Sequence, residues 1–588
     1  MRHLTRFAAL TGTALWLTAC GAPNTSGPGS VPGTAQAPDP AAAPAAAPVD
    51  AMVAAAHPDA VEAGLEALRR GGDAVDAAIA VQAVLGLVEP QSSGIAGGAF
   101  MVRYDAQTGE TIVYDGRETA PASVTENHWL NEDGEPVGFL EAWQSGRSTG
   151  VPGAIAMLAM AHGDHGRLDW SDGFDAGITL ATDGFEVSPR LSSLAQRVRQ
   201  ISSLARREQS RDYFYDPDGN AWPAGHVLTN PGYAATLTAV AADWRNFYTG
   251  EIAQQIIDTA AEEPLPGLIT PEDLAGYEPV RREALCAPYR VHLVCSAPPP
   301  SSGAIAVGAI MTILEGFDMS AHGPDTAEGW HLFIEASRLA YADRDQYVGD
   351  ADFADVPVAG LLDRDYLATR RGLIDPERAI PAISHGMPPG AQPAGPDTTP
   401  DNRGTTHFVI RDTFGNVVSM TTTVESGFGN NRMTEGGFLL NNQLTDFAFV
   451  PRDETGRLHP NAPEAGKRPR SSMSPTIVFD ADGSFVLATG SPGGNSIIAY
   501  TAKTLVGMLD WGLSAQEAAD LPNVVARGDV INIERGFDAD MLEALRQRGF
   551  EIDGERGENS GIHIIRMLED GTLEGAADPR REGVAARP

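Results

Sequence analysis

The first folded segment of the chain has the hydrophobic pattern of a helix. Apolar residues recur at Val61, Leu65 and Leu68, and a glycine pair then ends the pattern. Residues at this spacing lie on one face of a helix. A second helix is predicted from Asp73 onward. Its sequence, AVDAAIAVQAVLGLV, is apolar on nearly every side, so we expect it to be buried.

The rest of the chain divides into a hairpin, a helical middle and a strand-rich last third. The hairpin is predicted over 99–104 and 111–115, and residues 150–380 are typical of helices with loops. From Thr405 onward the pattern predicts strands over 405–411, 417–424, 475–480 and 484–489, then a helix over about 495–509. Helices, then strands, then helices predict one α/β body with helical layers on a sheet core.

The turn between the first two of these strands predicts their register. Residues 412–416 (DTFGN) have a turn composition. If the hairpin is centred on Phe414, Thr405 and Thr423 are equally far from the turn and face each other. Directly opposed residues have Cβ atoms about 4.5–5.5 Å apart. We therefore expect the two threonine hydroxyls to meet.

Thr405 has two interpretations. It follows a loop rich in Pro, Gly, Asp and Thr, over 384–403, and it can simply be a β-branched residue that begins a strand. Alternatively, the chain is cut before Thr405. A threonine hydroxyl is a poor nucleophile without a base, and a free α-amine has an unperturbed pKa of about 7.7–8.0. A cut would thus supply nucleophile and base from one residue.

Composition and charge exclude some classes of partner. The 588 residues are 42% hydrophobic and 20% charged, which is typical of a soluble globular protein. The 42 basic and 78 acidic side chains give a net charge of −36, spread along the chain. Nucleic acids and anionic membrane surfaces are polyanions, so neither is expected as the main partner.

The N-terminus is typical of an exported protein. Arg2 and Arg6 precede the apolar run 7–17, and Leu-Thr-Ala then leads to Cys20. This resembles a bacterial lipoprotein signal over 1–19, with Cys20 lipidated; the alternative is an ordinary signal peptide with an incidental cysteine. Residues 20–49 are low-complexity Ala, Pro and Gly, as in a disordered tether. We expect a periplasmic or cell-envelope lipoprotein of a bacterium, in membrane contact only through its lipid.

The two remaining cysteines, Cys286 and Cys295, flank the strand-like stretch 289–294. In an exported protein such a pair forms a disulfide or stays as two free thiols, and the first is favoured. A fully extended run would hold them too far apart, so a disulfide requires a local fold-back.

With these residues in place, the chain from Met52 to about Met567 resembles the γ-glutamyltranspeptidase family of N-terminal nucleophile hydrolases. The strongest motif is Thr405-Thr406-His407 after an Asp- and Gly-containing loop. The resemblance implies a four-layer αββα sandwich. It also implies self-cleavage between Gly404 and Thr405 into a large subunit, 50–404, and a small subunit, 405–588, that remain together as a heterodimer.

The resemblance further assigns roles to residues of this chain. Thr405 is the expected nucleophile and Thr423 orients it, while Gly493 and Gly494 of GSPGGN form an oxyanion hole. On the bare motif, GSPGGN is equally a glycine-rich turn between strand and helix. The residues expected to bind substrate are Arg117, Ser471 and Ser472 for the α-carboxylate, and Gln443, Asp446 and Glu425 for the α-ammonium.

Two departures leave the substrate open. Glu425 stands where some members have Asn, and the segment between Asp446 and Ser471, which forms a lid in some members, has an intermediate length. The implied activity is hydrolysis of glutathione or other γ-glutamyl amides, or transfer of the γ-glutamyl group to an amino acid or peptide, without a cofactor or metal. The alternatives are a cephalosporin or glutaryl acylase of the same superfamily, and an inactive surface binding lipoprotein.

Overall fold

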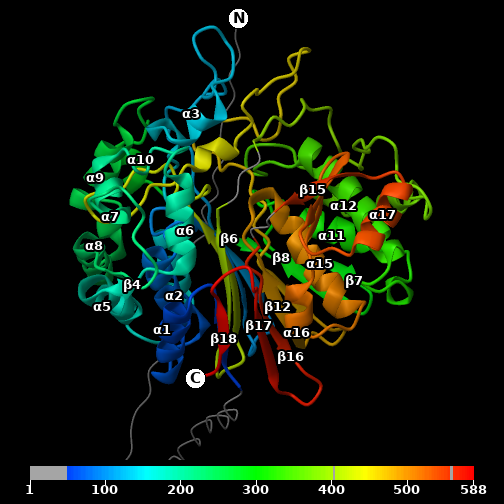
Figure 1. Ribbon diagram of the computed structural model, residues 1–588, viewed down its shortest axis with the longest axis horizontal. Helices are drawn as coiled ribbons and strands as arrows, with labels where there is room; N and C mark the ends of the chain where they lie inside the picture. The colour runs from blue at the N-terminus through cyan, green and yellow to red at the C-terminus, as the bar shows by residue number, and fades with distance from the viewer. Residues whose placement is uncertain (1–49, 401–403, 557–559) are drawn as a thin grey trace, which may run out of the picture. The chain divides into compact units, whose positions relative to one another are not determined.

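Two antiparallel sheets packed face to face form the centre of the protein (Figure 1). The computed structural model describes residues 50–400, 404–556 and 560–588. The signal peptide, the tether over 20–49 and Cys20 lie outside the described residues. All described residues belong to one compact unit.

The larger sheet has seven strands in the order β18-β1-β9-β10-β2-β3-β6. Their bounds are β1 Met52–Ala55, β2 Gly98–Tyr104, β3 Thr111–Gly116, β6 Val280–Glu283, β9 Thr406–Arg411, β10 Val417–Thr423 and β18 Val584–Ala586.

The smaller central sheet has six strands in the order β17-β16-β12-β11-β8-β7. They are β7 Leu285–Tyr289, β8 His292–Ser296, β11 Thr476–Phe479, β12 Phe485–Gly490, β16 His563–Met567 and β17 Leu573–Ala577. Two peripheral sheets consist of β4 Phe185–Glu186 with β5 Val227–Leu228, and of β13 Val524–Ala526, β14 Val530–Glu534 and β15 Glu551–Arg556.

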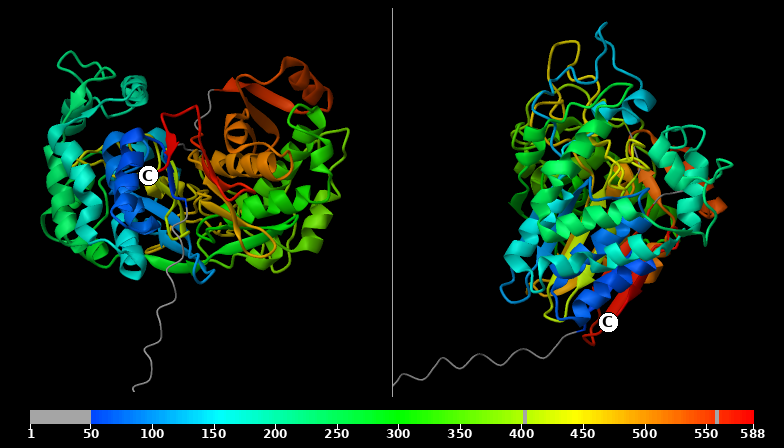
Figure 2. Two further views of the ribbon diagram at one scale, coloured as in Figure 1. Left: turned by 90° about the horizontal axis from the view of Figure 1, so that it is seen from below. Right: turned by 90° about the vertical axis from the view of Figure 1, so that its left-hand side faces the viewer.

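Helices cover the outer face of each central sheet, which gives the four layers expected from the family resemblance (Figures 1 and 2). The layer on the seven-stranded sheet includes α1 Pro58–Arg69, α2 Ala74–Val88, α4 Ala154–His165, α5 Asp175–Asp183, α6 Pro189–Val198, α7 Glu208–Phe214, α8 Pro231–Ala242 and α9 Gly250–Ala260. The layer on the six-stranded sheet includes α11 Gly303–Leu314, α12 Ala327–Tyr347, α14 Arg364–Arg371, α15 Ile497–Leu509, α16 Ala515–Asp520 and α17 Ala539–Gln547. Short helices are α3 Phe139–Trp143, α10 Pro271–Ala275 and α13 Val358–Leu361.

Alternation along the central strands explains why the two sheets pack. In β9, Phe408 and Ile410 belong to the core under the helices, whereas Val409 points into the core between the sheets. Side chains of successive strand residues point to opposite faces. Because both faces of β9 are covered, each of these three side chains is fully buried.

The hairpin register predicted from the sequence is confirmed. β9 and β10 pair Arg411 with Val417 and Thr406 with Thr422, which is a turn centred on Phe414. The prediction missed the short strand β1, which pairs with β9, because its partners are distant in the chain.

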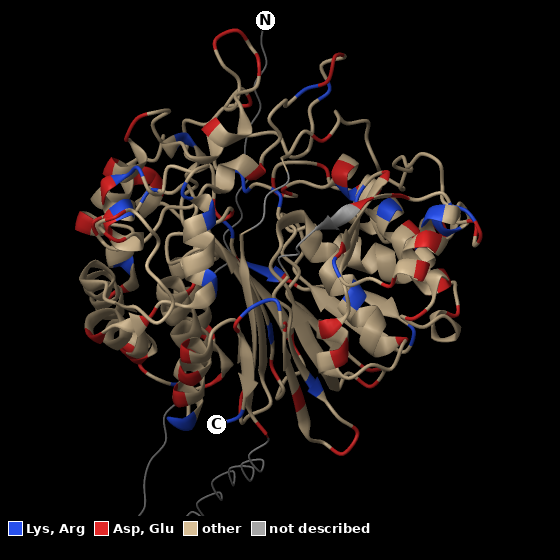
Figure 3. Cartoon of the chain, viewed as in Figure 1, with Lys and Arg blue, Asp and Glu red and all other residues tan. Residues whose placement is uncertain are grey.

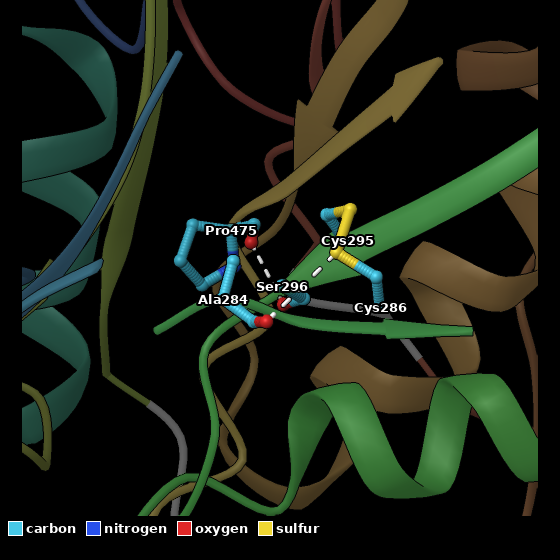
Figure 4. The surroundings of a disulfide bond; sticks show 5 residues. All are labelled: Ala284, Cys286, Cys295, Ser296 and Pro475. Carbon is cyan, nitrogen blue, oxygen red and sulfur yellow. Dashed lines mark hydrogen bonds between the residues drawn. A yellow bond between two sulfur atoms is a disulfide. The ribbon is translucent and has the colours of Figure 1, made fainter. Parts of the chain in front are cut away.

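The strand expected over 289–294 is wrong as a single strand. Residues 285–289 and 292–296 form a hairpin, with a turn that includes Arg290 at φ +54°. The turn places Cys286 directly opposite Cys295, with Cα atoms 4.0 Å apart, and the two are joined by a disulfide (Figure 4). The required fold-back is this hairpin.

The segments before and after Gly404 are interleaved in the seven-stranded sheet. β9 and β10 insert between β1 and β2, and β18 pairs with the other edge of β1. Separating the two segments would therefore break strand pairing along several edges of one sheet.

Charged side chains lie mainly outside the central sheets. Figure 3 shows acidic residues over both helical layers and many loops rather than in one tail. Among the described helices, none combines the length and the apolar character needed to cross a membrane.

Candidate active site

Thr405 lies at the start of β9, where the sheet brings its hydroxyl to Thr423. The two Oγ1 atoms are 3.2 Å apart, and the Thr423 hydroxyl donates a 2.7 Å hydrogen bond to the carbonyl oxygen of Gly404. The Thr405 hydroxyl also contacts that carbonyl oxygen. Thr423 in turn accepts a 2.8 Å hydrogen bond from the backbone N–H of Glu425. The peptide bond expected to be cut is thus held beside both hydroxyls.

Gly404 is required by a close approach of two backbone segments. A Cβ atom at this position would lie 2.5 Å from the carbonyl oxygen of Glu425 and 2.5 Å from the carbonyl carbon of Ser426. Backbone atoms cannot swing aside as a side chain can. Any larger residue at 404 would therefore shift the 404–405 peptide bond relative to the hydroxyls of Thr405 and Thr423.

Arg581, near the C-terminus, reaches the same strand start. Its Nη1 donates a 2.9 Å hydrogen bond to the carbonyl oxygen of Thr405 and lies 3.0 Å from Glu89. Burial, and next the neighbouring Arg190, lower the pKa of Arg581 to about 10. Arg581 was not predicted from the sequence, since nothing local to its loop indicates a contact 176 residues away.

His407, the last residue of the Thr-Thr-His motif, lies behind the site. Its Nδ1 lies 2.9 Å from the hydroxyl of Thr421, and its ring packs on Gly490, where a Cβ would come within 2.5 Å. Burial, and then His563, hold the pKa of His407 well below its ordinary value, so the ring is neutral. The His407 ring packs between the two central sheets, next to the start of the strand that follows Thr405.

Arg117 and Asp446 meet on the opposite wall. Nη2 of Arg117 lies 2.5 Å from Oδ2 of Asp446 and 3.0 Å from the carbonyl oxygen of Arg470. Gln443 donates a 2.6 Å hydrogen bond to the same oxygen of Asp446. Arg117 is 1% exposed and Asp446 22%, so the cation is fixed in the wall while the carboxylate faces the pocket.

Glu118 lies behind Arg117 and has an unusual environment. It is fully buried, and one of its carboxylate oxygens lies 3.8 Å from Arg117 Nη1. Among the residues that the structure describes, neither carboxylate oxygen has a hydrogen-bond partner. Burial raises the pKa of Glu118 to about 8, and the attraction of Arg117 offsets only part of that rise. Glu118 is therefore mainly neutral at pH 7, which leaves the positive charge of Arg117 available to the pocket.

Ser472 is held by Arg344, which was not predicted from the sequence. Nη2 of Arg344, in α12, donates to Ser472 Oγ at 2.6 Å and to Asn495 Oδ1 at 3.0 Å. Burial, and next the nearby Arg470, lower the pKa of Arg344 to about 10, so it remains a cation at pH 7. Ser471, one residue earlier, accepts a 3.0 Å hydrogen bond from the N–H of Met473.

Tyr341 also reaches Asn495, the residue after the glycine pair. Its hydroxyl donates a 2.6 Å hydrogen bond to the carbonyl oxygen of Asn495. Gly493 and Gly494 have φ of +138° and +58°, which favour glycine. Tyr341 and Arg344 lie one turn apart on α12 and are fully buried, so this helix fixes the turn from behind. No local pattern singles out these two residues, because α12 also carries other buried polar residues such as Glu335 and Arg338.

Glu425 also lies in a strained backbone conformation, with φ of +81°. Its Oε2 accepts a 2.5 Å hydrogen bond from the Ser426 hydroxyl and contacts Asn442. A non-glycine residue at positive φ is uncommon and points to a local functional constraint. The side chain is only 5% exposed, so its carboxylate belongs to the wall of the pocket.

Many of the residues described above line one pocket, which has about 400 Å³ of space between atoms, open solvent included. Of the residues proposed from the sequence, those that line it are Thr405, Thr423, Arg117, Glu425, Gln443, Asp446, Ser471, Ser472 and Gly494. Gly404 and Gly493 adjoin it. Arg344, Arg470, Thr399 and Asn495 line it as well and were not predicted.

The geometry agrees with the comparisons. Residues 60–587 match the family model described as Gamma-glutamyltranspeptidase. The chain belongs to the γ-glutamyltranspeptidase family. It is similar to the glutathione hydrolase proenzyme of Escherichia coli (strain K12), with 36% identity over 90% of each chain. It is also similar to the glutathione hydrolase proenzyme of Bacillus subtilis (strain 168), with 34% identity over 91% of each.

The fold is shared with solved structures of the N-terminal nucleophile type. A cephalosporin acylase from Bacillus halodurans superposes with a TM-score of 0.78 and 27% identity, over 94% of this chain and 98% of that one. The resemblance of this chain to the γ-glutamyltranspeptidase family, and its four-layer fold, are thereby confirmed.

The segment that forms a lid in some γ-glutamyltranspeptidases is a folded turn in this member. Arg452 pairs with Leu458 in an isolated bridge, and the Arg452 guanidinium lies 2.7 Å from Glu126. The backbone N–H of Val450 donates a 2.9 Å hydrogen bond to the hydroxyl of Thr398. In the uncut chain this turn therefore packs against the segment that leads to Gly404.

Proposed function

We propose that this chain transfers the γ-glutamyl group of glutathione and related amides to water, an amino acid or a peptide, with Thr405 as the nucleophile. The observation that carries the proposal is the Thr405–Thr423 hydroxyl pair, 3.2 Å apart, in the same pocket as the Arg117–Asp446 ion pair. The hydroxyl pair can perform acyl transfer, and the ion pair offers charges that complement those of an α-amino acid group.

Maturation begins in the uncut chain. The Thr405 hydroxyl oxygen attacks the carbonyl carbon of Gly404, while the Thr423 hydroxyl polarises the carbonyl oxygen through its 2.7 Å hydrogen bond. The C–N bond breaks, the hydroxyl proton passes to the nitrogen, and an ester links Gly404 to Thr405. Water then hydrolyses the ester, which leaves a carboxylate on Gly404 and a free α-amine on Thr405.

Turnover uses that amine as base. It takes the proton of the Thr405 hydroxyl as the oxygen attacks the γ-carbonyl carbon of the donor. Backbone N–H groups of Gly493 and Gly494 stabilise the negative charge that develops on the carbonyl oxygen. The leaving amine departs with the proton, and a γ-glutamyl ester remains on Thr405. Water or an acceptor amine then attacks this ester, giving glutamate or a new γ-glutamyl amide.

Donor recognition needs opposite charges at adjacent positions. The α-carboxylate lies against Arg117, Ser471 and Ser472, because a guanidinium and hydroxyls bind a carboxylate. The α-ammonium lies against the exposed edge of Asp446 with Gln443 beside it, and Glu425 adds a second carboxylate. No cofactor is needed for these steps.

This charge pattern separates the proposal from the acylase alternative. A glutaryl group has no α-ammonium, so an acylase would have no substrate cation for Asp446 and Glu425 to bind. Sequence identity separates the two activities only slightly, since the two glutathione hydrolase relatives are 36% and 34% identical and an acylase proenzyme of Pseudomonas sp. (strain V22) is 32% identical.

The location proposed for the enzyme is the bacterial cell envelope, with a lipid on Cys20 as the anchor. The support is the sequence of the first 20 residues and the tether that follows. Cys20→Ala should release the protein from membranes while activity persists, because Cys20 precedes in sequence every residue that lines the pocket. Recovery of the native protein in the cytoplasm, unprocessed and without lipid, would contradict the anchor.

The decisive experiment is a denaturing gel with N-terminal sequencing of the purified protein. Cleavage after Gly404 should give a small chain of 588 − 404 = 184 residues that begins Thr-Thr-His. Thr405→Ala should remain one inactive chain. An active native protein that also remains one chain would overturn the mechanism.

A further inference from the structure

A cluster of three arginines and two aspartates lies beside the nucleophile pocket and is not used by the proposed mechanism. Arg470 Nη2 lies 2.7 Å from Oδ2 of Asp397, and Arg527 Nη2 lies 3.1 Å from the same oxygen. Arg527 Nε also lies 2.8 Å from Asp345, and Arg344 Nη1 lies 2.6 Å from Asp345. Two guanidinium groups thus converge on one carboxylate oxygen of Asp397.

Arg470 is built into the pocket wall. It is 1% exposed, it lines the pocket that contains Thr405, and it directly precedes Ser471. Its backbone carbonyl is the one that accepts from Arg117. The residue therefore borders the proposed γ-glutamyl site with its backbone and directs its guanidinium to Asp397.

Asp397 comes from the segment that precedes the cut. Thr399, two residues later, lines the pocket, and its N–H donates a 3.0 Å hydrogen bond to Oδ1 of Asp397. In the uncut chain this segment is held at both ends; once Gly404 is cut from Thr405, it is attached at one end only. The carboxylate bound between Arg470 and Arg527 thus belongs to the segment whose C-terminal end is freed by a cut after Gly404.

The charge balance of the cluster changes when Asp397 withdraws. Asp397 supplies the carboxylate oxygen that lies between Arg470 and Arg527, so its withdrawal would remove a negative charge from between these two guanidinium groups. His459 adds no cation at pH 7, since burial lowers its pKa to about 4. Although burial alone would raise the pKa of Asp397, Arg470 and its neighbours hold it well below the usual range, so the carboxylate is ionised. A ligand carboxylate can take its place between the two guanidinium groups.

We propose that Arg470 and Arg527 bind the free carboxylate of the acceptor, and of the peptide that leaves the donor, in the position that Asp397 occupies before the cut. This inference rests on the proposed function. Glutathione loses a dipeptide that carries a carboxylate, and an incoming amino acid or peptide occupies the same side of the ester as the leaving group did. Two converging guanidinium groups favour a carboxylate over a neutral amide.

The test compares two acceptors that differ only in that carboxylate. Native enzyme and Arg470→Gln are assayed with γ-glutamyl-p-nitroanilide as donor and with glycylglycine or glycylglycinamide as acceptor. The ratio of kcat/KM for glycylglycine to kcat/KM for glycylglycinamide should fall by roughly tenfold or more in the variant. Arg457→Gln, which changes an exposed arginine paired with Asp453, should leave this ratio unchanged.

A second arm tests the leaving group. Glutathione releases a carboxylate-bearing peptide, whereas γ-glutamyl-p-nitroanilide releases an uncharged amine. The ratio of their kcat/KM values for hydrolysis should fall in Arg470→Gln as well. If only the acceptor ratio falls, the site serves acceptors alone, and the leaving-group half of the proposal is overturned.

Failure of the carboxylate site can be distinguished from failure of the proposed function. Equal losses for glycylglycine and glycylglycinamide, or no loss for either, would overturn the carboxylate site while leaving γ-glutamyl transfer intact. A native protein that does not hydrolyse γ-glutamyl-p-nitroanilide would instead overturn the proposed function. If Arg470→Gln does not mature on a denaturing gel, Arg527→Gln, whose side chain is 23% exposed, provides the same ratio test.

Discussion

The guanidinium of Arg117 and the carboxylate of Asp446 form an ion pair with Nη2 2.5 Å from Oδ2, although the residues are 329 positions apart in the chain. Arg117 follows β3, and Asp446 ends a short 3₁₀ helix over Gln443–Asp446. The pair lies in the pocket wall with the acid more exposed than the base. A zwitterionic α-amino acid group has the complementary charges at a similar separation.

This pair predicts strong dependence of donor use on both residues. Arg117→Ala and Asp446→Ala should each lower kcat/KM for γ-glutamyl-p-nitroanilide by about a hundredfold or more. The first removes the cation proposed to bind the donor carboxylate, and the second removes the acceptor of the donor ammonium and leaves the buried Arg117 without its carboxylate partner. Self-cleavage should proceed, since it involves no substrate carboxylate. Arg457→Ala, on the exposed turn, is the control. Glutaryl-p-nitroanilide hydrolysed as fast as the γ-glutamyl compound would instead favour an acylase.

Gly404 predicts a separate effect on maturation. Gly404→Ala would place a Cβ 2.5 Å from two backbone atoms, so the peptide bond must shift and self-cleavage should slow by roughly tenfold or more. The rate is followed on denaturing gels after synthesis of the uncut chain. Gly163→Ala, where a Cβ would meet nothing within 4 Å, should mature at the native rate. Normal maturation of Gly404→Ala would refute the positional argument.

The hydrogen bond from Tyr341 to the residue after the glycine pair predicts that Tyr341 affects catalysis without touching the substrate. Tyr341→Phe removes the 2.6 Å hydrogen bond to the carbonyl oxygen of Asn495, and kcat should fall by about tenfold with little change in KM. A loosened turn weakens stabilisation of the transition state more than donor binding. Tyr347→Phe, on the same helix but bonded to Gly386, is the matched control. A rise in KM at unchanged kcat would assign Tyr341 to donor binding instead.

Glu118 predicts a pH-dependent contribution to stability. Its folded pKa of about 8 exceeds the ordinary value of 4.5, so between these values the folded chain holds a proton that the unfolded chain has lost. Its stabilising contribution is complete below pH 4.5 and is lost as the pH rises to 8. In the uncut Thr405→Ala background, Glu118→Gln should therefore gain unfolding free energy relative to its parent between pH 5 and pH 8.5 in urea titrations. An equal difference at both pH values would contradict the prediction.

The disulfide predicts a redox-dependent stability. Cys286 and Cys295 should resist alkylation until reduced, and Cys286→Ser with Cys295→Ser should lower the unfolding free energy by about 2 kcal/mol. Only the β7–β8 hairpin should loosen, because the bridge spans nine residues within it. Measurement is by thiol labelling and urea titration of the uncut background. Labelling of both cysteines without reductant would disprove the bridge in the purified protein.

The predictions from sequence succeeded where the determinants are local. The 405–411 and 417–424 strands share a short turn, so composition alone gave the register that places Thr405 at Thr423. β1 and β18 are short and pair across hundreds of residues, which no local pattern indicates. The same limit applies to the site.

Residues with a recognisable motif around them were found, whereas those that act by distant contacts were not. Arg344 lies within a helix whose pattern indicates only burial, and its contact with Ser472 spans 128 positions. Arg581 reaches Thr405 across 176. Such contacts depend on how the two sheets stack, which hydrophobic periodicity does not specify.

The interleaving of strands in the seven-stranded sheet has a consequence for timing. β9 begins where the cut is made, and it already lies between β1 and β10 when the Gly404 carbonyl meets the two hydroxyls. A chain that has not assembled this sheet has no means to cut itself. A new N-terminus at Thr405 therefore marks a molecule whose seven-stranded sheet has assembled. The fraction of uncut chain in a sample then measures how many molecules have not yet assembled this sheet or have not yet been cleaved.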